Sequence, residues 1–150
     1  MEESEVKLDF FSNKKVVVFG APGVGKTSLT KRIDKGICPQ NTQDNAFMYS
    51  QVTHTLINGK KMHLNVYEID IGKDVDYKNM MVPDAQLYKT FLFQCQLAIF
   101  MIDIQSTDSF TAVQELMALL NDIDYPYLKR LFISNKIDQE ALKNVSQFEI

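Results

Sequence analysis

The chain has 150 residues, of which 45% are hydrophobic, and this is the size of a single domain with one hydrophobic core. Its formal net charge of −3 and the scattered positions of its 16 basic residues argue against nucleic acid as a partner. The two cysteines, Cys38 and Cys95, stand far apart and have no histidine at metal-ligand spacing. We therefore expect reduced thiols in a cytoplasmic protein, rather than a disulfide or a zinc site.

Residues 1–13 read as a polar N-terminal lead-in to a domain that occupies residues 14–150. The lead-in lacks the basic and apolar regions of a secretory signal. No apolar run approaches the roughly twenty residues that a membrane-spanning helix needs, and neither end of the sequence carries a lipidation motif. We expect no direct membrane anchor.

The first strong signal of the domain is a strand, a glycine-rich loop and a helix in succession. Residues 15–19 form a β-branched apolar run, which predicts a strand buried on both faces. The segment Gly20-Ala21-Pro22-Gly23-Val24-Gly25-Lys26-Thr27 then matches in full the phosphate-loop pattern of Gly, four residues, Gly-Lys and Ser or Thr. A helix is predicted over residues 27–35, and Gly36 closes it.

The residue types of this loop suit a polyphosphate. Glycine permits tight turns and close approach of backbone N–H groups to an anion. Lys26 supplies a mobile positive charge and is the one catalytic candidate, while the Thr27 hydroxyl suits a Mg²⁺ ion that bridges phosphates. The start of the helix turns its positive dipole end toward the anion. The residues expected to bind the phosphates are Gly20, Gly23, Val24, Gly25, Lys26, Thr27 and Ser28.

A β-hairpin is predicted next, after a polar surface loop. Residues 47–57 and 61–69 are extended runs on either side of Asn58-Gly59, which is a strong hairpin signal. Asp70-Ile71-Gly72 ends the hairpin, and a short helix is expected over residues 85–93 after a polar stretch.

The second half of the chain predicts two more buried strands and a helix between them. Residues 97–103 form a continuous apolar run, and the helix that follows has Ser106 to Ser109 as cap residues. Residues 128–134 form a further strand, which carries Asn135-Lys136-Ile137-Asp138 at its carboxyl end. Parallel strands that alternate with helices indicate an α/β sheet with ligands at the strand carboxyl ends.

The phosphate loop and Asn135-Lys136-Ile137-Asp138, each placed after a strand, together resemble a small GTPase of the Ras superfamily. The resemblance implies the Ras-like P-loop NTPase fold, with a mostly parallel central sheet, helices on both faces and one β-hairpin. It also implies that Asn135, Lys136 and Asp138 bind guanine. Asp138 can accept hydrogen bonds from N1–H and the exocyclic amine of guanine, which adenine does not offer there. Asn135 can contact the purine and brace the phosphate loop, and the stem of Lys136 would cover the base.

The carboxylate that faces Mg²⁺ is ambiguous in this sequence. The family's Asp-x-x-Gly motif appears as Asp70-Ile71-Gly72, which is one residue short. Counting along the hairpin from Asn58-Gly59 instead places Glu68 in the Asp position. Of the two carboxylates we choose Asp70, together with Thr27, as the metal-facing pair.

The hydrolytic machinery of the family is also altered. Lys73 stands where the family has a water-orienting Gln, and a cation cannot accept a hydrogen bond from the nucleophilic water. The Thr that ligates Mg²⁺ in the triphosphate state falls on Asn45 or Ala46, with Thr42 a few residues early. Cys38 or a neighbour replaces the aromatic residue beside the base. The resemblance runs to Asp138, after which twelve residues follow. We expect the family's last strand and helix to be missing from this sequence, either because the sequence is truncated or because the domain is naturally reduced.

These features favour a GTP- or GDP-binding domain with Mg²⁺ as cofactor and at most weak GTPase activity. It would act as a signalling switch that contacts protein partners through residues 37–50 and 70–85. The alternative is a non-hydrolysing pseudo-GTPase that serves as an interaction or adaptor module, which Lys73 and the missing Thr favour. A third class, an ATP-type P-loop enzyme, fits the phosphate loop alone, and residues 135–138 argue against it.

Overall fold

The computed structural model describes residues 13–36, 47–72, 85–120, 125 and 128–136. Their elements, in chain order, are β1 (Asn13–Gly20), α2 (Lys26–Lys35), β2 (Phe47–Thr55), β3 (Lys61–Asp70), α3 (Ala85–Leu92), β4 (Leu97–Asp103), α4 (Thr107–Leu119) and β5 (Lys129–Asn135). The strands form one sheet in the order β2-β3-β1-β4-β5. Only the β2–β3 pair is antiparallel, which confirms the predicted mostly parallel sheet with one hairpin.

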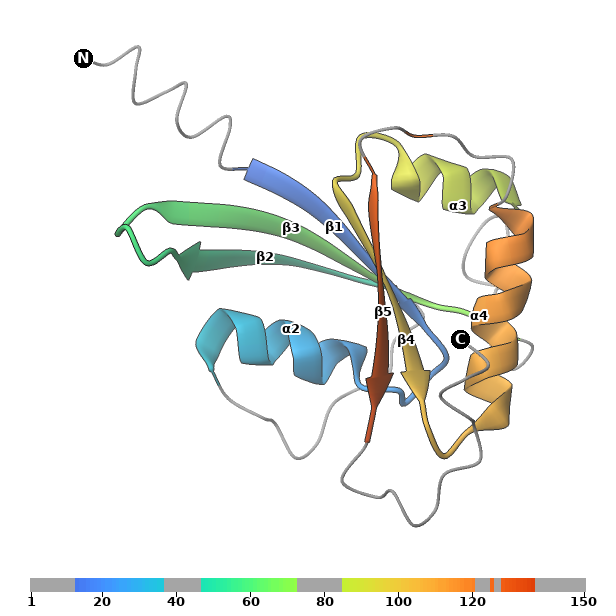
Figure 1. Ribbon diagram of the computed structural model, residues 1–150. Helices are drawn as coiled ribbons and strands as arrows, with labels where there is room; N and C mark the ends of the chain where they lie inside the picture. Colours follow the sequence, from blue (N-terminus) through green and yellow to red (C-terminus); the bar gives the residue numbers. More distant parts are fainter. Residues whose placement is uncertain (1–12, 37–46, 73–84, 121–124, 126–127, 137–150) are drawn as a thin grey trace.

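Helices cover both faces of this sheet (Figure 1): α2 lies on one face, and α3 and α4 lie on the other. The alternation of β1 explains this arrangement, because successive side chains of a strand point to opposite faces. Val16 and Val18 belong to a buried cluster that Leu29 of α2 joins. Val17 and Phe19 belong to the larger cluster beneath α3 and α4. The apolar side chains of β1 are therefore buried on both faces of the sheet, which explains why the run is continuous.

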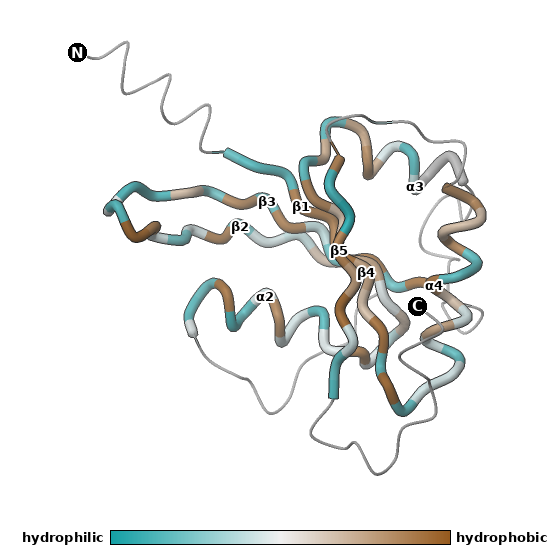
Figure 2. The backbone as a smooth tube through the Cα atoms, viewed as in Figure 1, coloured by the Kyte–Doolittle hydropathy of each residue, from teal (hydrophilic) through white to brown (hydrophobic). Residues whose placement is uncertain are grey.

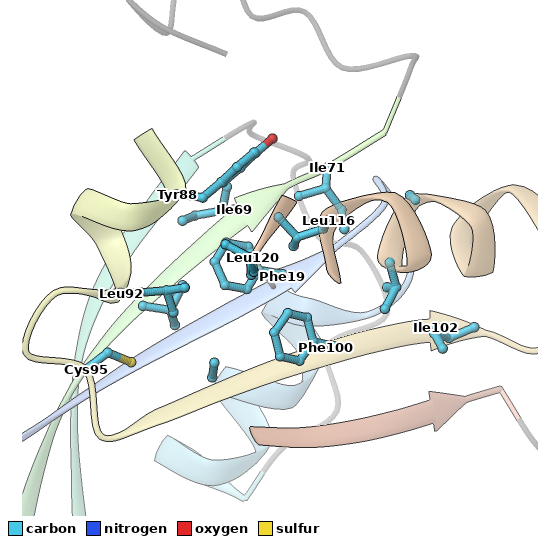
Figure 3. Close-up of a cluster of buried hydrophobic side chains, with 14 of the residues drawn as sticks. Phe19, Ile69, Ile71, Tyr88, Leu92, Cys95, Phe100, Ile102, Leu116 and Leu120 are labelled. Atoms are coloured by element: carbon cyan, nitrogen blue, oxygen red, sulfur yellow. The ribbon is translucent and has the colours of Figure 1, made fainter. Parts of the chain in front are cut away.

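The larger cluster is built around two stacked rings of the central strands (Figure 3). Phe19 and Phe100 have ring centroids 5.5 Å apart, and Phe132 of β5 stacks on the other side of Phe100 at 5.1 Å. Leu116 and Leu120 cover the rings from the side of α4. Figure 2 shows where hydrophobic residues lie along the chain: they occupy the middle of β1 and β4, whereas the start of β1 is hydrophilic.

The predicted start and stop signals lie at the observed element ends. Gly36 ends α2 in the left-handed conformation, with φ of 70°. The Ser106 side chain caps α4 by accepting a hydrogen bond from the N–H of Ser109. Gly59, with φ of 81°, takes the positive-φ position in the hairpin turn. In the described part of the chain, no helix is both long and apolar enough to cross a membrane.

The strand register brings polar residues to one edge of the sheet. Gly20 lies opposite Asp70 on β3 and opposite Met101 on β4, and Asp103 lies opposite Asn135 on β5. The carboxyl ends of these strands therefore meet, and this is where α/β sheets bind their ligands. Residues 1–12 of the proposed lead-in, residues 37–46 and 73–84 of the two proposed partner-contact segments, and Asp138 lie outside the described residues. Asn13, the last residue of the proposed lead-in, is the first residue of β1.

We expect Phe100→Ala to destabilise the fold by about 3–5 kcal/mol, since a fully buried ring that stacks on two others would leave a cavity. Urea unfolding measures this free energy. Phe93→Ala is the matched control, because the Phe93 side chain is 60% exposed. Equal losses in the two variants would contradict the assignment of Phe100 to the centre of the core.

Candidate functional site

The loop between β1 and α2 is held in place by its apolar residue and shaped by its glycines. Val24 is 1% exposed and packs into the cluster that contains Val18 and Met101. Gly25 has a φ of 108°, which favours glycine, and a Cβ atom there would collide with the side-chain amide of Asn135. This position therefore needs glycine for its backbone conformation and for the approach of Asn135.

Lys26 is the first residue of α2, and its ammonium group is turned back beneath the loop. The side chain is 7% exposed. Its Nζ atom donates to the carbonyl oxygens of Gly20 and Ala21, both at 3.0 Å. It also lies 2.6 Å from Oδ1 of Asp70, at the end of β3. Three acceptors thus match the three N–H donors of the ammonium group.

Glu68 is a second carboxylate beside the loop. It lies two residues before Asp70 on β3, so both side chains point to the same face of the strand. Glu68 is 2% exposed, and its Oε1 atom accepts a hydrogen bond of 3.3 Å from the Thr30 hydroxyl. Its Oε2 atom is buried without a hydrogen-bond partner among the described residues.

The environment of Glu68 disfavours its ionised form. Burial raises the pKa of this carboxyl above its ordinary value of 4.5. The nearby hydroxyls of Thr27 and Thr30 and the charge of Lys26 lower the pKa in part, and the charge of Asp70 adds to the rise. A cation near Oε2 would reverse this penalty, because an opposite charge favours the ionised form.

The opposite side of the loop is tied to the end of β5. The side-chain amide of Asn135 donates to the carbonyl oxygen of Val24 at 2.9 Å, so the predicted brace between residues 135–138 and the phosphate loop is present. Lys136 follows with a φ of 63°, and its Nζ atom lies 2.8 Å from Oδ2 of Asp103 at the end of β4. That its stem covers a purine base stays a prediction.

These groups surround a hollow of about 160 Å³ at the carboxyl edge of the sheet. The lining residues are Gly23, Gly25, Lys26, Thr27, Ser28, Met48, Glu68, Asp70, Asn135 and Lys136. Eight of the positions expected from sequence to bind phosphate, base or metal therefore face one space. Gly20 and Val24 support it from the loop backbone through their carbonyl oxygens.

Sequence reasoning overlooked three residues of this site. Asp103 pairs with Lys136, Thr30 hydrogen-bonds to Glu68, and the Sδ atom of Met48 lies 3.8 Å from the Thr27 hydroxyl. Asp103 had a usable signal, since it is the acidic residue that ends an apolar strand. Thr30 and Met48 had none, because their contacts join α2 to β3 and β2.

With the geometry described, the chain can be compared with known proteins. The sequence model of the Ras family matches residues 15–149, which is nearly the whole chain. The chain belongs to the Ras family. A search of curated proteins found no match.

Membership of the Ras family indicates which class of ligand the domain binds. This Ras-family domain is a nucleotide-binding domain of small-GTPase type, whose ligands are GTP and GDP. The loop at residues 20–27 is its phosphate loop. In the described part of the chain, no three His, Cys, Asp or Glu side chains are grouped to hold a metal ion.

We expect Glu68→Gln to remove part of the pH dependence of stability. Because the pKa of Glu68 is higher in the folded protein, the unfolded chain releases this proton first as the pH rises past 4.5. The free energy of unfolding should then fall until the pH has passed the raised pKa. The Gln variant should lack this fall.

Urea unfolding between pH 4 and pH 8, without divalent cations, compares the two proteins. Glu115→Gln is the control, since Glu115 is an exposed residue of α4. If the free energy of unfolding of Glu68→Gln changes with pH in parallel with that of the wild type over the whole range, Glu68 does not contribute to the pH dependence of stability as expected.

Proposed function

We propose that this domain binds GTP or GDP together with Mg²⁺, hydrolyses GTP slowly or not at all, and acts as a cytoplasmic signalling switch. The observation that carries the proposal is the buried ammonium of Lys26, which contacts the loop carbonyls of Gly20 and Ala21 beside a hollow that Lys26 lines at the carboxyl edge of the sheet. A buried lysine in this position provides a charge-assisted contact for a phosphate oxygen.

The preference for guanine rests on the segment that starts at Asn135. The Asn135–Val24 hydrogen bond holds the start of this segment against the phosphate loop. A nucleotide with its phosphates at Lys26 would then extend toward Lys136, which also lines the hollow. The hollow of about 160 Å³ suits the phosphate end of such a ligand, since it is smaller than the roughly 300–1,000 Å³ of whole-ligand pockets.

The residues of the hollow also fit Mg²⁺. This ion prefers hard oxygen ligands and is usually held by one or two protein groups together with substrate phosphates and water. Here the Thr27 hydroxyl, the buried Oε2 atom of Glu68 and the Asp70 carboxylate are the available oxygens. Thr27 with one of the two carboxylates would hold the ion, which neutralises charge on the phosphates when bound.

Slow hydrolysis follows from the residues that replace the family's catalytic groups. Lys73 stands in the place of the water-orienting Gln, and no Thr is in register to close residues 37–50 over Mg²⁺. Without an oriented water, phosphoryl transfer to water lacks its nucleophile. Residues 37–50 and 70–85 would contact protein partners and respond to the bound nucleotide.

The second candidate is an adaptor that binds nucleotide without hydrolysing it. The same two substitutions favour it, and the intact phosphate loop is compatible with it. The two candidates share the binding step and differ in whether GTP is turned over.

Lys26→Ala should abolish or greatly reduce the stabilisation that GDP and Mg²⁺ give to the protein, because a charge-assisted contact worth roughly 1.5–3 kcal/mol is lost. The readout is the ligand-induced shift in melting temperature, since the variant also leaves Asp70 buried without its partner. Lys31→Ala, on the exposed face of α2, should retain the shift. ATP in place of GDP should give little shift. An unchanged shift in Lys26→Ala, or an equal response to ATP, would contradict the proposal.

Single-turnover hydrolysis of GTP by the isolated protein should be slower than in ordinary small GTPases. Measuring bound GTP and released phosphate in the same sample separates lost binding from slow chemistry. Retained GTP with no phosphate release would favour the adaptor. A rate equal to that of ordinary small GTPases would show that another group orients the water. It would then favour a hydrolysing switch over the adaptor.

A further inference from the structure

We propose that the two carboxylates at the end of β3 have separate roles: Asp70 is a built-in competitor for the phosphate that Lys26 binds, and Glu68 is the carboxylate that faces the metal ion. This inference rests on the proposed function, and it concerns how tightly the site holds its ligand.

The first step concerns the hydrogen-bonding capacity of Lys26. Its three N–H donors are matched by the carbonyls of Gly20 and Ala21 and by Oδ1 of Asp70. A phosphate oxygen that binds Nζ must therefore replace one of these acceptors. The Asp70 carboxylate is the one that carries negative charge, as a phosphate oxygen does.

The second step concerns which acceptor gives way. The Gly20 carbonyl is fixed from two directions, because it also accepts a hydrogen bond of 3.1 Å from the N–H of Ile71. The Ala21 carbonyl accepts from the N–H of Val24 at 3.3 Å, within the loop turn. Asp70 is held through a side chain, which can change rotamer while its backbone stays paired with Gly20. Two anions beside one ammonium group also repel each other, so the phosphate displaces Asp70.

The third step concerns Glu68. Its Oε2 atom is buried without a hydrogen-bond partner among the described residues, Glu68 is one of the residues that line the hollow, and its carboxyl lies beside the Thr27 hydroxyl. Thr27 is the expected hydroxyl ligand of the ion. Whether or not Asp70 is paired with Lys26, Glu68 has an oxygen available for a cation. The one-residue mismatch of Asp70-Ile71-Gly72 with the family motif agrees with this division, because the hairpin count places Glu68 at the metal-facing position.

The test compares three single variants of the full chain by calorimetric titration with GDP and with inorganic pyrophosphate, each with Mg²⁺ and with EDTA. The variants are Asp70→Asn, Glu68→Gln and the control Asp34→Asn, which removes one negative charge from the exposed face of α2. Asparagine keeps the shape of Asp70 and an acceptor for Lys26 but removes the competing charge. Asp70→Ala is measured as well, so that a folding defect in one variant does not decide the result.

We expect Asp70→Asn to bind both ligands about tenfold more tightly than the wild type, with and without Mg²⁺, since a charge-assisted contact no longer has to be broken. Its ratio of affinities in Mg²⁺ and EDTA should equal that of the wild type. Glu68→Gln should lose most of the Mg²⁺ effect, and Asp34→Asn should match the wild type throughout.

Equal or weaker binding by both Asp70 variants in EDTA would overturn the competitor role. Loss of the Mg²⁺ effect in Asp70→Asn, with its retention in Glu68→Gln, would reverse the metal assignment. If the wild type and all variants bind neither GDP nor pyrophosphate under either condition, the proposed function itself is wrong.

Discussion

The structure around the site depends on burying one ammonium group. A buried charge is tolerated only when its donors are satisfied, and for Lys26 this requires two loop carbonyls and a carboxylate at fixed places. Those places exist because β1 ends at Gly20 directly opposite Asp70, and because α2 begins where the loop turns back. The apolar residues of β1, which pack on both faces of the sheet, hold this arrangement in place.

Asn135 connects the end of β5 to this arrangement. Its hydrogen bond to Val24 joins the end of β5 to the phosphate loop across 111 residues of sequence. Gly25 leaves room for that side chain, so this glycine of the loop is needed for the contact with Asn135. The distance between the loop after β1 and the end of β5 is thus set by packed strands rather than by the loops alone.

Most of the fold could be predicted from the sequence, because its signals are local. The apolar runs of β1 and β4, the Asn58-Gly59 turn and the Ser106 cap depend on nearby residues, and each element predicted with bounds lies within two residues of its observed bounds. The roles of Glu68 and Asp70 could not be separated, because residues two apart on a strand share one face. Their partners, Thr30 and Lys26, are contributed by α2, and side-chain pairing between elements leaves no periodic signal. The pairing of Lys136 with Asp103 was hidden for the same reason, although the place of Asp103 at the end of an apolar strand was a usable signal for the site.

The two ion pairs of the site also have a consequence for the approach of a charged ligand from solution. Lys26 and Lys136 each lie against an aspartate, and Glu68 adds a third carboxyl among the described residues. The hollow therefore presents little net positive potential at long range, and the chain as a whole carries a formal charge of −3. Electrostatic steering, which speeds the encounter of charged ligands at low ionic strength, would contribute little here. Capture of the ligand would instead be decided after contact, by short-range hydrogen bonds and by the accompanying cation.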